Sequence, residues 1–337
     1  MSPRLILALL VLLCCPPPAA ADQPRPIRLL FTGDNLLGGR MDTLLRTHGP
    51  AYPYAHVAPL LAGADFAFGN LECPLTTALV PTAGKSVESL EAKREFLFKA
   101  DPVLGGQALA MAGFDLVSVA NNHAMDYQAV GMEETLRTLD RLQIRAAGGG
   151  YTWNQATSPR IVTLQGIRIG VLACSMVNPI GSAALPDRAG MYTAPKCWTP
   201  FLKSQVEALD RKTGLVVFTV HWGTEATPVP EPYQVKIAEA AIEAGADLVI
   251  GHHPHVLQPV RRHRGGVIAY SLGNFCFTGK AHKLPSAMLE ATVDESGLRD
   301  IRLYPILVEH GRPRWTGDHG TVTLLDRLAP GIERVLP

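Results

Sequence analysis

The chain has 337 residues, of which 47% are hydrophobic, and its formal net charge at pH 7 is +1. This length and apolar content suffice for a packed core, in one large domain or two small ones. The near-neutral charge excludes the strongly basic surface typical of nucleic-acid-binding proteins. The one dense basic run, Arg261–Arg264, precedes Gly265-Gly266 and is predicted to be a solvated hairpin tip.

The N-terminus has the features of a secretory signal peptide. A positive charge at Arg4 precedes the unbroken apolar run Leu5–Leu13, and Ala19-Ala20-Ala21 fits the small-residue cleavage pattern. The apolar run is shorter than the roughly 20 residues that a membrane-spanning helix needs. We therefore expect residues 1–21 to be a signal peptide and the protein to be secreted or periplasmic.

The cysteines leave two points open. Cys14 and Cys15 raise the alternative of a lipoprotein anchor, although two leucines precede them where such signals have a small residue. The mature chain keeps an even number of cysteines, which permits disulfides in an oxidising compartment. They are Cys73, Cys174, Cys197 and Cys276. Cys174 and Cys197 bracket a segment rich in proline and glycine and are the first pair to test, while free buried thiols account equally well for the pattern.

The first two predicted strands both lead to an acidic residue. Ile27–Phe31 is a buried-strand pattern that stops at Thr32-Gly33-Asp34. After a helical pattern over Tyr54–Ala62, the short strand Phe66–Phe68 ends at Gly69-Asn70-Leu71-Glu72. A carboxylate just past the end of a strand is well placed to reach a ligand.

The third predicted strand leads to amide and imidazole groups. Phe114–Val119 stops at Ala120-Asn121-Asn122-His123, and Asp126 follows. Upstream, Gly84–Glu95 is polar without clear periodicity, which indicates a surface excursion. Pro102–Ala112 is predicted to be a helix, with the aspartate before it as N-cap and proline at its first position.

The middle of the chain alternates helices with short strands. Helices are predicted over Val130–Leu142 and over Thr199–Lys212, where the first threonine is the cap. Arg160–Leu164 and Ile167–Ala173 indicate a hairpin, and Asn178–Pro195 is loop-like. None of these segments adds a new cluster of polar residues at a strand end.

Two further strands end at histidines. The apolar run Leu215–Val220 ends on His221, a helix-like segment follows, and Leu248–Ile250 ends on Gly251-His252-His253-Pro254-His255. This order indicates a βαβ unit with buried parallel strands, and ligands bind beyond the carboxyl ends of such strands. In extended backbone, the side chains of His253 and His255 would share one face, with the intervening proline stiffening the pair.

Past residue 274 the pattern changes. Ala287–Val293, Leu298–Pro305 and Ile306–Glu309 alternate or run apolar, which predicts a second, more antiparallel sheet. We find no internal repeat and no convincing linker after Pro26. The simplest prediction is one mature domain over residues 22–337.

The five strand ends together predict one metal site assembled on one edge of the sheet. Zinc, iron and manganese take imidazole and carboxylate ligands, and two such ions can clamp a phosphoryl group and activate water. The candidate ligands are Asp34, Glu72, Asn122, His221, His253 and His255. Structural alternatives exist for most of them: Asp34 as the cap of a turn, Asn122 in an Asx-turn, and each histidine as a hydrogen-bonded surface or core residue. Trp222 is assigned to packing, and five histidines to structural or solvent-exposed roles: His252, His263, His282, His310 and His319.

The order of short motifs over about residues 27–277 resembles the CapA-type family of poly-γ-glutamate capsule biosynthesis proteins. Each motif alone is weak, whereas the combination is highly specific. The motifs are Gly33-Asp34 with Arg40, Gly69-Asn70-Leu71-Glu72 with Pro74-Leu75-Thr76, Ala120-Asn121-Asn122-His123 with Asp126, His221-Trp222-Gly223 with Glu225, Gly245-Ala246-Asp247, His253-Pro254-His255-Val256 with Gln258, and Tyr270-Ser271-Leu272-Gly273-Asn274-Phe275.

The resemblance implies an α/β fold like that of the calcineurin-like metallophosphoesterases, in which two mixed β-sheets pack face to face and are flanked by helices. By position it implies Asp34 as the first-motif ligand, Glu72 as the bridging carboxylate and Asn122 as an amide ligand, with three histidines completing the metal shell: His221, His253 and His255. It implies His123, held by Asp126, as an acid or transition-state stabiliser. Arg40 and Glu225 would contact substrate, and Asn274 would hold the shell.

Three positions depart from the family pattern. Leu36 stands where the metallophosphoesterases have a histidine, so one metal position loses an imidazole, although Gly33-Asp34 with Arg40 is the CapA-type form of this motif. Ala226 stands where the family often has an aromatic residue, and Gln128 where glycine is expected. The first departure bears on the number of ions, and the other two bear on substrate choice.

The first functional hypothesis is an extracytoplasmic protein of capsule-polymer biosynthesis or export with a metal-dependent hydrolase or phosphoesterase-like site. It implies one or two divalent ions (Mn, Fe or Zn), an anionic polymer or phosphoester substrate, a membrane-bound capsule synthesis complex as partner, and no nucleic acid. The second hypothesis is a non-catalytic polymer-binding or assembly factor that keeps a degenerate cleft. The missing first-motif histidine supports the second hypothesis, and retention of the other ligand types argues against a wholly decayed site.

Overall fold

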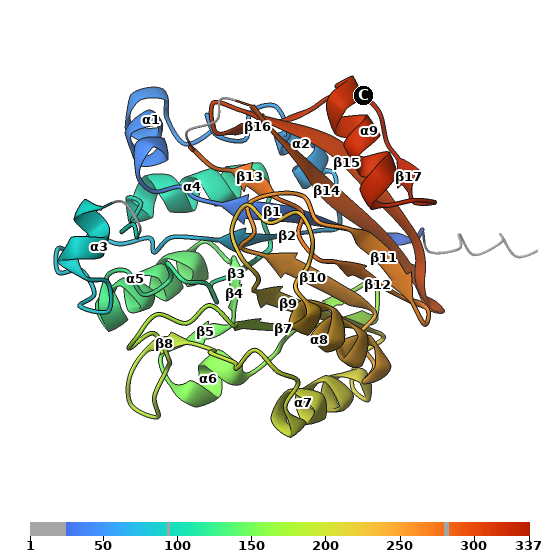
Figure 1. Cartoon of the computed structure of the whole chain (residues 1–337), viewed down its shortest axis with the longest axis horizontal. Helices are drawn as coiled ribbons and strands as arrows, with labels where there is room; N and C mark the ends of the chain where they lie inside the picture. The colour runs from blue at the N-terminus through green and yellow to red at the C-terminus, as the bar shows by residue number, and fades with distance from the viewer. Residues whose placement is uncertain (1–24, 93–94, 280–282) are drawn as a thin grey trace, which may run out of the picture.

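The computed structural model describes residues 25–92, 95–279 and 283–337 (Figure 1). The predicted signal peptide, with Cys14 and Cys15, lies outside these residues, as does His282. No helix within the described ranges combines the length and the apolar character that crossing a membrane requires.

The larger of two main sheets combines parallel strands from the first half of the chain with antiparallel strands from its end. Its strands are β1 (Ile27–Asn35), β2 (Phe66–Leu71), β3 (Leu116–Ser118), β4 (Arg145–Ala147), β13 (Asn274–Cys276), β14 (Lys283–Asp294), β15 (Gly297–Glu309), β16 (Arg312–Trp315) and β17 (Glu333–Arg334). They lie in the order β16-β15-β14-β1-β2-β3-β4, with β13 beside β1 and β17 beside β15. The strands from β1 to β4 are parallel, and β14 joins β1 in the antiparallel sense.

The second sheet is built around the predicted βαβ unit. Its strands are β6 (Arg160–Leu164), β7 (Ile167–Ser175), β9 (Leu215–His221), β10 (Leu248–His252), β11 (Val260–His263) and β12 (Gly266–Ala269). They lie in the order β11-β12-β10-β9-β7-β6, and the inner four are parallel. A separate pair, β5 (Gly149–Gly150) and β8 (Gly190–Met191), is antiparallel.

Helices cover the outer faces of both sheets (Figure 1). Those of the described residues are α1 (Arg40–His48), α2 (Ala58–Ala62), α3 (Val87–Glu91), α4 (Pro102–Ala112), α5 (Gln128–Arg141), α6 (Trp153–Thr157), α7 (Pro200–Asp210), α8 (Pro232–Glu243) and α9 (His319–Leu328). The apolar faces of α1, α2, α4 and α5 pack on the larger sheet, and those of α7 and α8 pack on the smaller one.

The alternation of side chains along each strand divides the apolar interior into layers. Leu29 and Phe31 of β1 point into the core between the two sheets, whereas Leu30 points outward to the helices. Val217 of β9 likewise faces the inner core, and Phe218 faces the helix layer on the opposite side. The predicted architecture, two mixed sheets packed face to face and flanked by helices, is therefore confirmed.

Several local predictions are confirmed by the same pattern. The helix predicted at Pro102–Ala112 is α4, and the Asp101 side chain accepts hydrogen bonds from the amides of Val103 and Leu104. Thr199 caps α7 in the same way. The predicted hairpins are β6–β7 and β11–β12.

Two predictions about the sheets are wrong. The antiparallel C-terminal strands do not form a sheet of their own, because β14 pairs with the free edge of β1 and extends the larger sheet. The five strands that lead to the polar clusters belong to both sheets rather than to one. The described residues of Gly84–Glu95 lie at the surface as predicted, since α3 has no buried residue, but the side chain of Lys85 is buried.

Of the two alternatives for the mature cysteines, free thiols hold, and the Cys174–Cys197 disulfide is not formed. Within the described residues the mature cysteines are free thiols: Cys73, Cys174 and Cys276 are buried and Cys197 is exposed. Cys174 belongs to β7 and packs in the core beneath α7 and α8, so its side chain is directed away from solvent. Trp222, by contrast, is fully buried as predicted, and its Nε1 donates a hydrogen bond to the carbonyl of Tyr270.

Candidate metal centre

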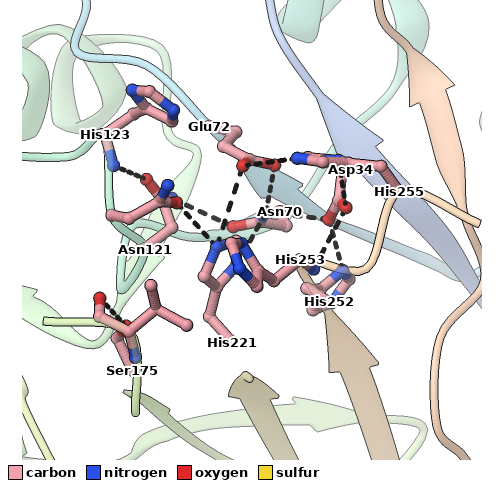
Figure 2. Close-up of polar contacts among 12 residues, drawn as sticks. Asp34, Asn70, Glu72, Asn121, His123, Ser175, His221, His252, His253 and His255 are labelled. Atoms are coloured by element: carbon pink, nitrogen blue, oxygen red, sulfur yellow. Dashed lines mark hydrogen bonds and ion pairs between the residues drawn. The ribbon is translucent and has the colours of Figure 1, made fainter. Parts of the chain in front are cut away.

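The carboxyl ends of strands from both sheets meet at one end of the sandwich. Asp34 of β1 is in register with Asn70 of β2, and in the other sheet His221 of β9 is in register with His252 of β10. The two sheets touch here, because Nδ1 of His252 lies 3.0 Å from Oδ1 of Asp34. Figure 2 shows that the side chains from both sheets converge on one cluster.

Asp34 is the most heavily bonded member of this cluster. It is fully buried, and its Oδ1 also accepts a hydrogen bond of 2.9 Å from Nδ2 of Asn70. Its Oδ2 accepts the amide of His253 at 3.2 Å and lies 3.3 Å from Nδ1 of His255. Burial alone would raise the pKa of Asp34, but the hydrogen bonds from His252 and His255 hold it well below its usual value. The carboxylate is therefore ionised.

Glu72 lies between two imidazoles. Its Oε2 accepts a hydrogen bond of 3.2 Å from Asn70, whereas its Oε1 is buried without a hydrogen-bond partner. Oε1 lies 3.7 Å from Nε2 of His221 and 3.6 Å from Nε2 of His255. These separations are too long for hydrogen bonds, and they leave the oxygen facing two ring nitrogens at once.

The carboxylates and imidazoles form two overlapping sets of metal-ligand atoms. One set is Glu72, His221 and His253, and the other is Asp34, Glu72 and His255, with the ligand atoms of each set within 4.8 Å of one another. Glu72 belongs to both sets, which matches the bridging position that the resemblance implies for it. Such a pair of nitrogen and oxygen sets fits one or two divalent ions.

The unsatisfied polar atoms of the structure support this fit. Six buried side-chain nitrogen or oxygen atoms of the described residues lack a hydrogen-bond partner, and three of them lie in this cluster. They are Oε1 of Glu72, Nε2 of His252 and Nδ1 of His253. Because an unpaired polar atom in the interior costs free energy, a concentration of such atoms indicates that a bound group completes the site.

Burial and neighbouring histidines lower the pKa of His221 and of His253, which keeps both rings neutral. Burial and the neighbouring His253 lower the pKa of His221 well below its usual value. Burial and the charge of His255 lower the pKa of His253 to about 3. Both rings are therefore neutral and keep a lone pair, which metal coordination requires.

Glu72 and His255 are shifted in the opposite direction. Burial is the main cause that raises the pKa of Glu72 well above its usual value, and the charge of Asp34 adds to it. Burial alone would lower the pKa of His255, but the charges of Glu72 and Asp34 raise it to about 9. The protonated ring of His255 thus places a positive charge beside Glu72 and Asp34. A bound divalent ion would replace the proton of His255.

The backbone of the H-x-H segment differs from the prediction. His253 has φ of 97° and His255 has φ of 57°, so the segment is not extended and the two side chains do not share a face in the predicted way. Their ring centroids are still only 5.8 Å apart. Positive φ is strained for a histidine and persists only where the surroundings impose it, which is common in binding sites.

Asn122 and His123 lie on the cavity side of the cluster. Oδ1 of Asn122 is 2.8 Å from Nε2 of His221, which brings the amide to the first ligand set. Nδ1 of His123 is 2.8 Å from Oδ2 of Asp126, so the carboxylate orients the ring as the resemblance implies. The backbone amide of His123 donates to Oδ1 of Asn121 at 3.1 Å.

Sequence reasoning missed Lys85. Its ammonium group is buried, forms an ion pair with Asp126, donates to the carbonyl of Phe96 at 2.8 Å and lies 3.1 Å from Nδ1 of His123. The aperiodic pattern around Lys85 carries no signal for an inward-pointing side chain. A lone lysine in a polar stretch is far more commonly exposed.

Sequence reasoning also missed His252 and underestimated Asn70. His252 is buried against Asp34, so the prediction of a structural role holds and that of a solvent-exposed one is wrong. Asn70 donates to both carboxylates of the cluster, and Oδ1 of Asn70 accepts from Asn121 at 3.0 Å. The sequence did contain a signal for both residues: His252 lies next to the candidate ligand His253, and Asn70 lies in the Gly69-Asn70-Leu71-Glu72 motif.

A cavity of about 350 Å³ adjoins the cluster. It is lined by Lys85, Glu95, Phe96, Asn122, His123, Val177, Asn178, Pro179, Glu225 and His253. Among the residues predicted to contact substrate, Glu225 therefore lines this cavity. Asn274 lies beside the cluster instead, with its Oδ1 2.9 Å from Nδ1 of His255. Arg40 does not line this cavity and instead borders a separate hollow of about 230 Å³ with Tyr52, Arg312 and Arg314.

The family model and two curated relatives concern capsule or PGA synthesis. A family model described as bacterial capsule synthesis protein PGA_cap matches residues 28–279. The chain is 29% identical over 294 residues to the capsule biosynthesis protein CapA of Bacillus anthracis, covering 86% of this chain and 69% of that protein. It is 29% identical over 286 residues to the PGA biosynthesis protein CapA of Bacillus subtilis (strain 168), covering 84% and 72%. Among solved structures, a novel phosphatase from Mycoplasma pneumoniae has a TM-score of 0.48 and 14% identity, covering 84% of this chain and 94% of that chain.

Proposed function

The chain belongs to the family of bacterial capsule synthesis proteins of the PGA_cap type, and we propose that it acts outside the cytoplasm as a metal-dependent hydrolase or phosphoesterase-like protein in the biosynthesis or export of a capsule polymer. The proposed polymer is of the poly-γ-glutamate type. Support comes from the two CapA relatives, whose names refer to capsule and PGA biosynthesis.

The single observation that carries the proposal is the environment of Glu72. Its Oε1 is buried without a partner, between ring nitrogens of His221 and His255 that lie 3.7 and 3.6 Å away. A carboxylate oxygen and two imidazoles in this arrangement are satisfied together by a shared cation. The proposed cofactor is one or two divalent ions of Mn, Fe or Zn.

When bound, such ions supply Lewis-acid chemistry at a phosphoryl or acyl oxygen and lower the pKa of water. The chain's own residues orient the site and move protons. Asp126 holds Nδ1 of His123 at 2.8 Å, which leaves Nε2 of that ring to exchange a proton with the reacting group. Asn70 fixes both carboxylates, and Asn274 fixes the His255 ring.

The proposed compartment, substrate and partner of the protein follow from its expected export. The predicted signal peptide supports a secreted or periplasmic location. A substrate in that compartment would be an anionic polymer or a phosphoester, and a membrane-bound capsule synthesis complex is the proposed partner. Lys85, Asn122 and His123 line the cavity and offer donors to an anionic substrate.

Metal analysis of protein purified without chelator tests this function. We expect Mn, Fe or Zn at one to two ions per chain, and hydrolysis of at least one member of a panel of phosphomonoesters, phosphodiesters and γ-glutamyl polymers. His221→Ala should lose both metal and activity. His263→Ala is the matched control, because His263 lies beside Glu243 at the surface and outside the cluster. Absence of metal from the wild type would sink the proposal.

The second candidate, a non-catalytic polymer-binding or assembly factor, is favoured by one observation. Leu36 stands where a metal-ligating histidine is expected, and its side chain is buried in the core beneath the larger sheet. Polymer binding by metal-free protein, unchanged in His221→Ala, would support this alternative over the enzyme.

A further inference from the structure

The ligand set Asp34, Glu72 and His255 has one side-chain ligand fewer than the four that are usual for such a metal site. These residues provide three ligand atoms. Leu36 cannot provide a fourth, because its hydrocarbon side chain has no donor atom and packs in the apolar core. Divalent transition metals in proteins usually have four or more ligands. If an ion binds to this set, another ligand has to come from elsewhere in the chain or from solvent.

The loop between β9 and α8 is fixed against the histidine loop. The amide of Ala226 donates a hydrogen bond of 2.9 Å to the carbonyl of Pro254, which lies between the two histidines of the H-x-H segment. Ala226 has φ of 56°, a left-handed conformation that is rare for alanine. Strain of this kind persists where the surroundings hold the backbone in place. The hydrogen bond to Pro254 fixes the residue next to Glu225 against the histidine loop.

The carboxylate of Glu225 faces the two histidines without bonding to them. One of its oxygens, a nitrogen of His253 and a nitrogen of His255 all lie within 4.8 Å of one another. In the described part of the chain His255 pairs with Asp34 and Glu72, and neither it nor His253 forms an ion pair with Glu225, so direct contact does not account for the arrangement. Two ligand atoms that share an ion, each about 2.1 Å from it, are separated by up to about 4.2 Å. A small inward movement of the side chain would therefore bring it to an ion shared with the rings.

The neighbouring His253 has a buried ring nitrogen without a hydrogen-bond partner, which a bound ion would satisfy. Its side chain is 5% exposed, and its Nδ1 has no hydrogen-bond partner in the described part of the chain. Glu225 itself is exposed and lines the same cavity as His253.

We propose that Glu225 is a ligand of the metal centre, which supplies from the β9–α8 loop the coordination that Leu36 cannot provide. This inference rests on the proposed metal-dependent function and assigns Glu225 to an ion shared with His253 and His255. With Asp34 and Glu72 it makes three carboxylates around the centre, which is a harder, more oxygen-rich ligand set than one completed by histidine. Such a set favours Mn²⁺ over softer ions.

Titration of the metal-free protein with Mn²⁺ tests the proposal, with calorimetry for affinity and electron paramagnetic resonance for the number and coupling of bound ions. We expect Glu225→Gln to bind one Mn²⁺ at least about tenfold more weakly than the wild type, and to lose the signal of coupled ions. Glu95→Gln is the matched control, because Glu95 lines the same cavity and belongs to none of the ligand sets. This control should bind Mn²⁺ as the wild type does.

The possible failures are distinguishable. If the wild type binds Mn²⁺ and Glu225→Gln binds it with the same affinity and stoichiometry, Glu225 is not a ligand, while the proposed function stands. If the wild type binds no divalent ion, the proposed function and this inference both fail. An equal loss in Glu95→Gln would show a general charge effect and would also overturn the inference. Because Glu225 is exposed, the variant should fold, which circular dichroism of the metal-free protein checks.

Discussion

Lys85 shows how a single residue can depend on partners far away in the sequence. Its side chain is 4% exposed and is paired with Asp126, which is 1% exposed and also accepts the amide of Phe98. Removing one member of a buried ion pair leaves the other charge without compensation. The pair therefore fixes the wall of the cavity as well as the ring of His123.

We predict that Lys85→Met lowers the free energy of unfolding by about 3 kcal/mol, because the carboxylate of Asp126 stays buried without its cation. Urea denaturation measures the change. Lys203→Met, at an exposed position beside Glu207, should change it by less than about 0.5 kcal/mol. Adding Asp126→Asn to Lys85→Met should recover part of the loss, and a further additive loss would contradict the buried-pair account.

The side-chain amide nitrogen of Asn70 donates hydrogen bonds to both carboxylates of the cluster, Asp34 and Glu72. We predict that Asn70→Asp, which replaces a shared donor by a third negative charge, lowers the melting temperature of the metal-free protein. The same variant should gain more from added Mn²⁺ than the wild type does, since the ion compensates the extra charge. Differential scanning calorimetry with and without Mn²⁺ measures both effects, and the exposed Asn154→Asp is the control.

Much of the cluster could be predicted residue by residue. The candidate ligands were found because each follows a strand end, and parallel strands bring those ends together. Lys85 could not be found in this way, since its burial depends on Asp126, 41 residues further along the chain. The left-handed backbone of His253 and His255 was also unpredictable, because the surrounding fold imposes it against local preference.

At the scale of elements, three strands are preceded by the same hydrogen-bonded aspartate turn. The tripeptides Gly63-Ala64-Asp65, Gly113-Phe114-Asp115 and Gly245-Ala246-Asp247 each lead from a helix into a strand. In each case the aspartate bonds twice to one residue of the neighbouring strand: its amide donates to the carbonyl, and its carboxylate accepts the amide. The neighbours are Arg28, Ala67 and Val216. The aspartate turn fixes strand register at the end of the sandwich opposite the metal centre.

We predict that Asp247→Ala lowers the free energy of unfolding by about 1–3 kcal/mol, because it leaves the amide of Val216 buried without its 2.7 Å hydrogen bond. Chemical denaturation measures the effect. The exposed Asp187→Ala is the control and should change stability by less than about 0.5 kcal/mol. Equal effects of the two substitutions would show that the aspartate turn contributes nothing.

The first of these aspartates also predicts a pH dependence. Burial alone would raise the pKa of Asp65, but hydrogen bonds from Arg25 and the amide of Arg28 outweigh it and lower the pKa. A lowered pKa in the folded state means that the stabilisation is present above the unfolded-state value of about 3.9 and is lost as the pH falls through the folded-state value. Asp65→Asn should therefore lose less stability than the wild type between about pH 5 and pH 3, as measured by urea denaturation at each pH. An identical pH profile would contradict this account.

The elements were predicted better than their assembly. Helix α4 was predicted from a cap, a proline and its length, all of which are local signals. The place of β14 was not, because its alternating pattern fits the edge of any sheet. The choice of β1 as its neighbour depends on an edge left open by strands elsewhere in the chain.

At the scale of the whole molecule, the metal centre joins the two sheets. The first ligand set takes Glu72 from the larger sheet's side and His221 with His253 from the smaller sheet's side. An ion bound there stabilises only the closed sandwich, because the unfolded chain does not hold these groups together. We propose on the same grounds that residues 22–337 fold as one domain.

We predict that Mn²⁺ raises the stability of the whole protein and that a chelator removes this gain. At a free ion concentration of about 100 times the dissociation constant, the gain is about 2.7 kcal/mol. Thermal unfolding with Mn²⁺ and with EDTA measures it. The shift should disappear in His221→Ala and persist in the His263→Ala control, and a shift that survives in His221→Ala would place the ion elsewhere.

The antiparallel pairing of β1 with β14 has a consequence for how the chain can fold. β1 is among the first segments to be made, and β14 follows more than 240 residues later. Until β14 has been synthesised, one edge of β1 offers open backbone groups to any other extended chain. Pairing across so long a separation is slow, so this edge of β1 is exposed to unwanted pairing with other chains until the last strands are in place.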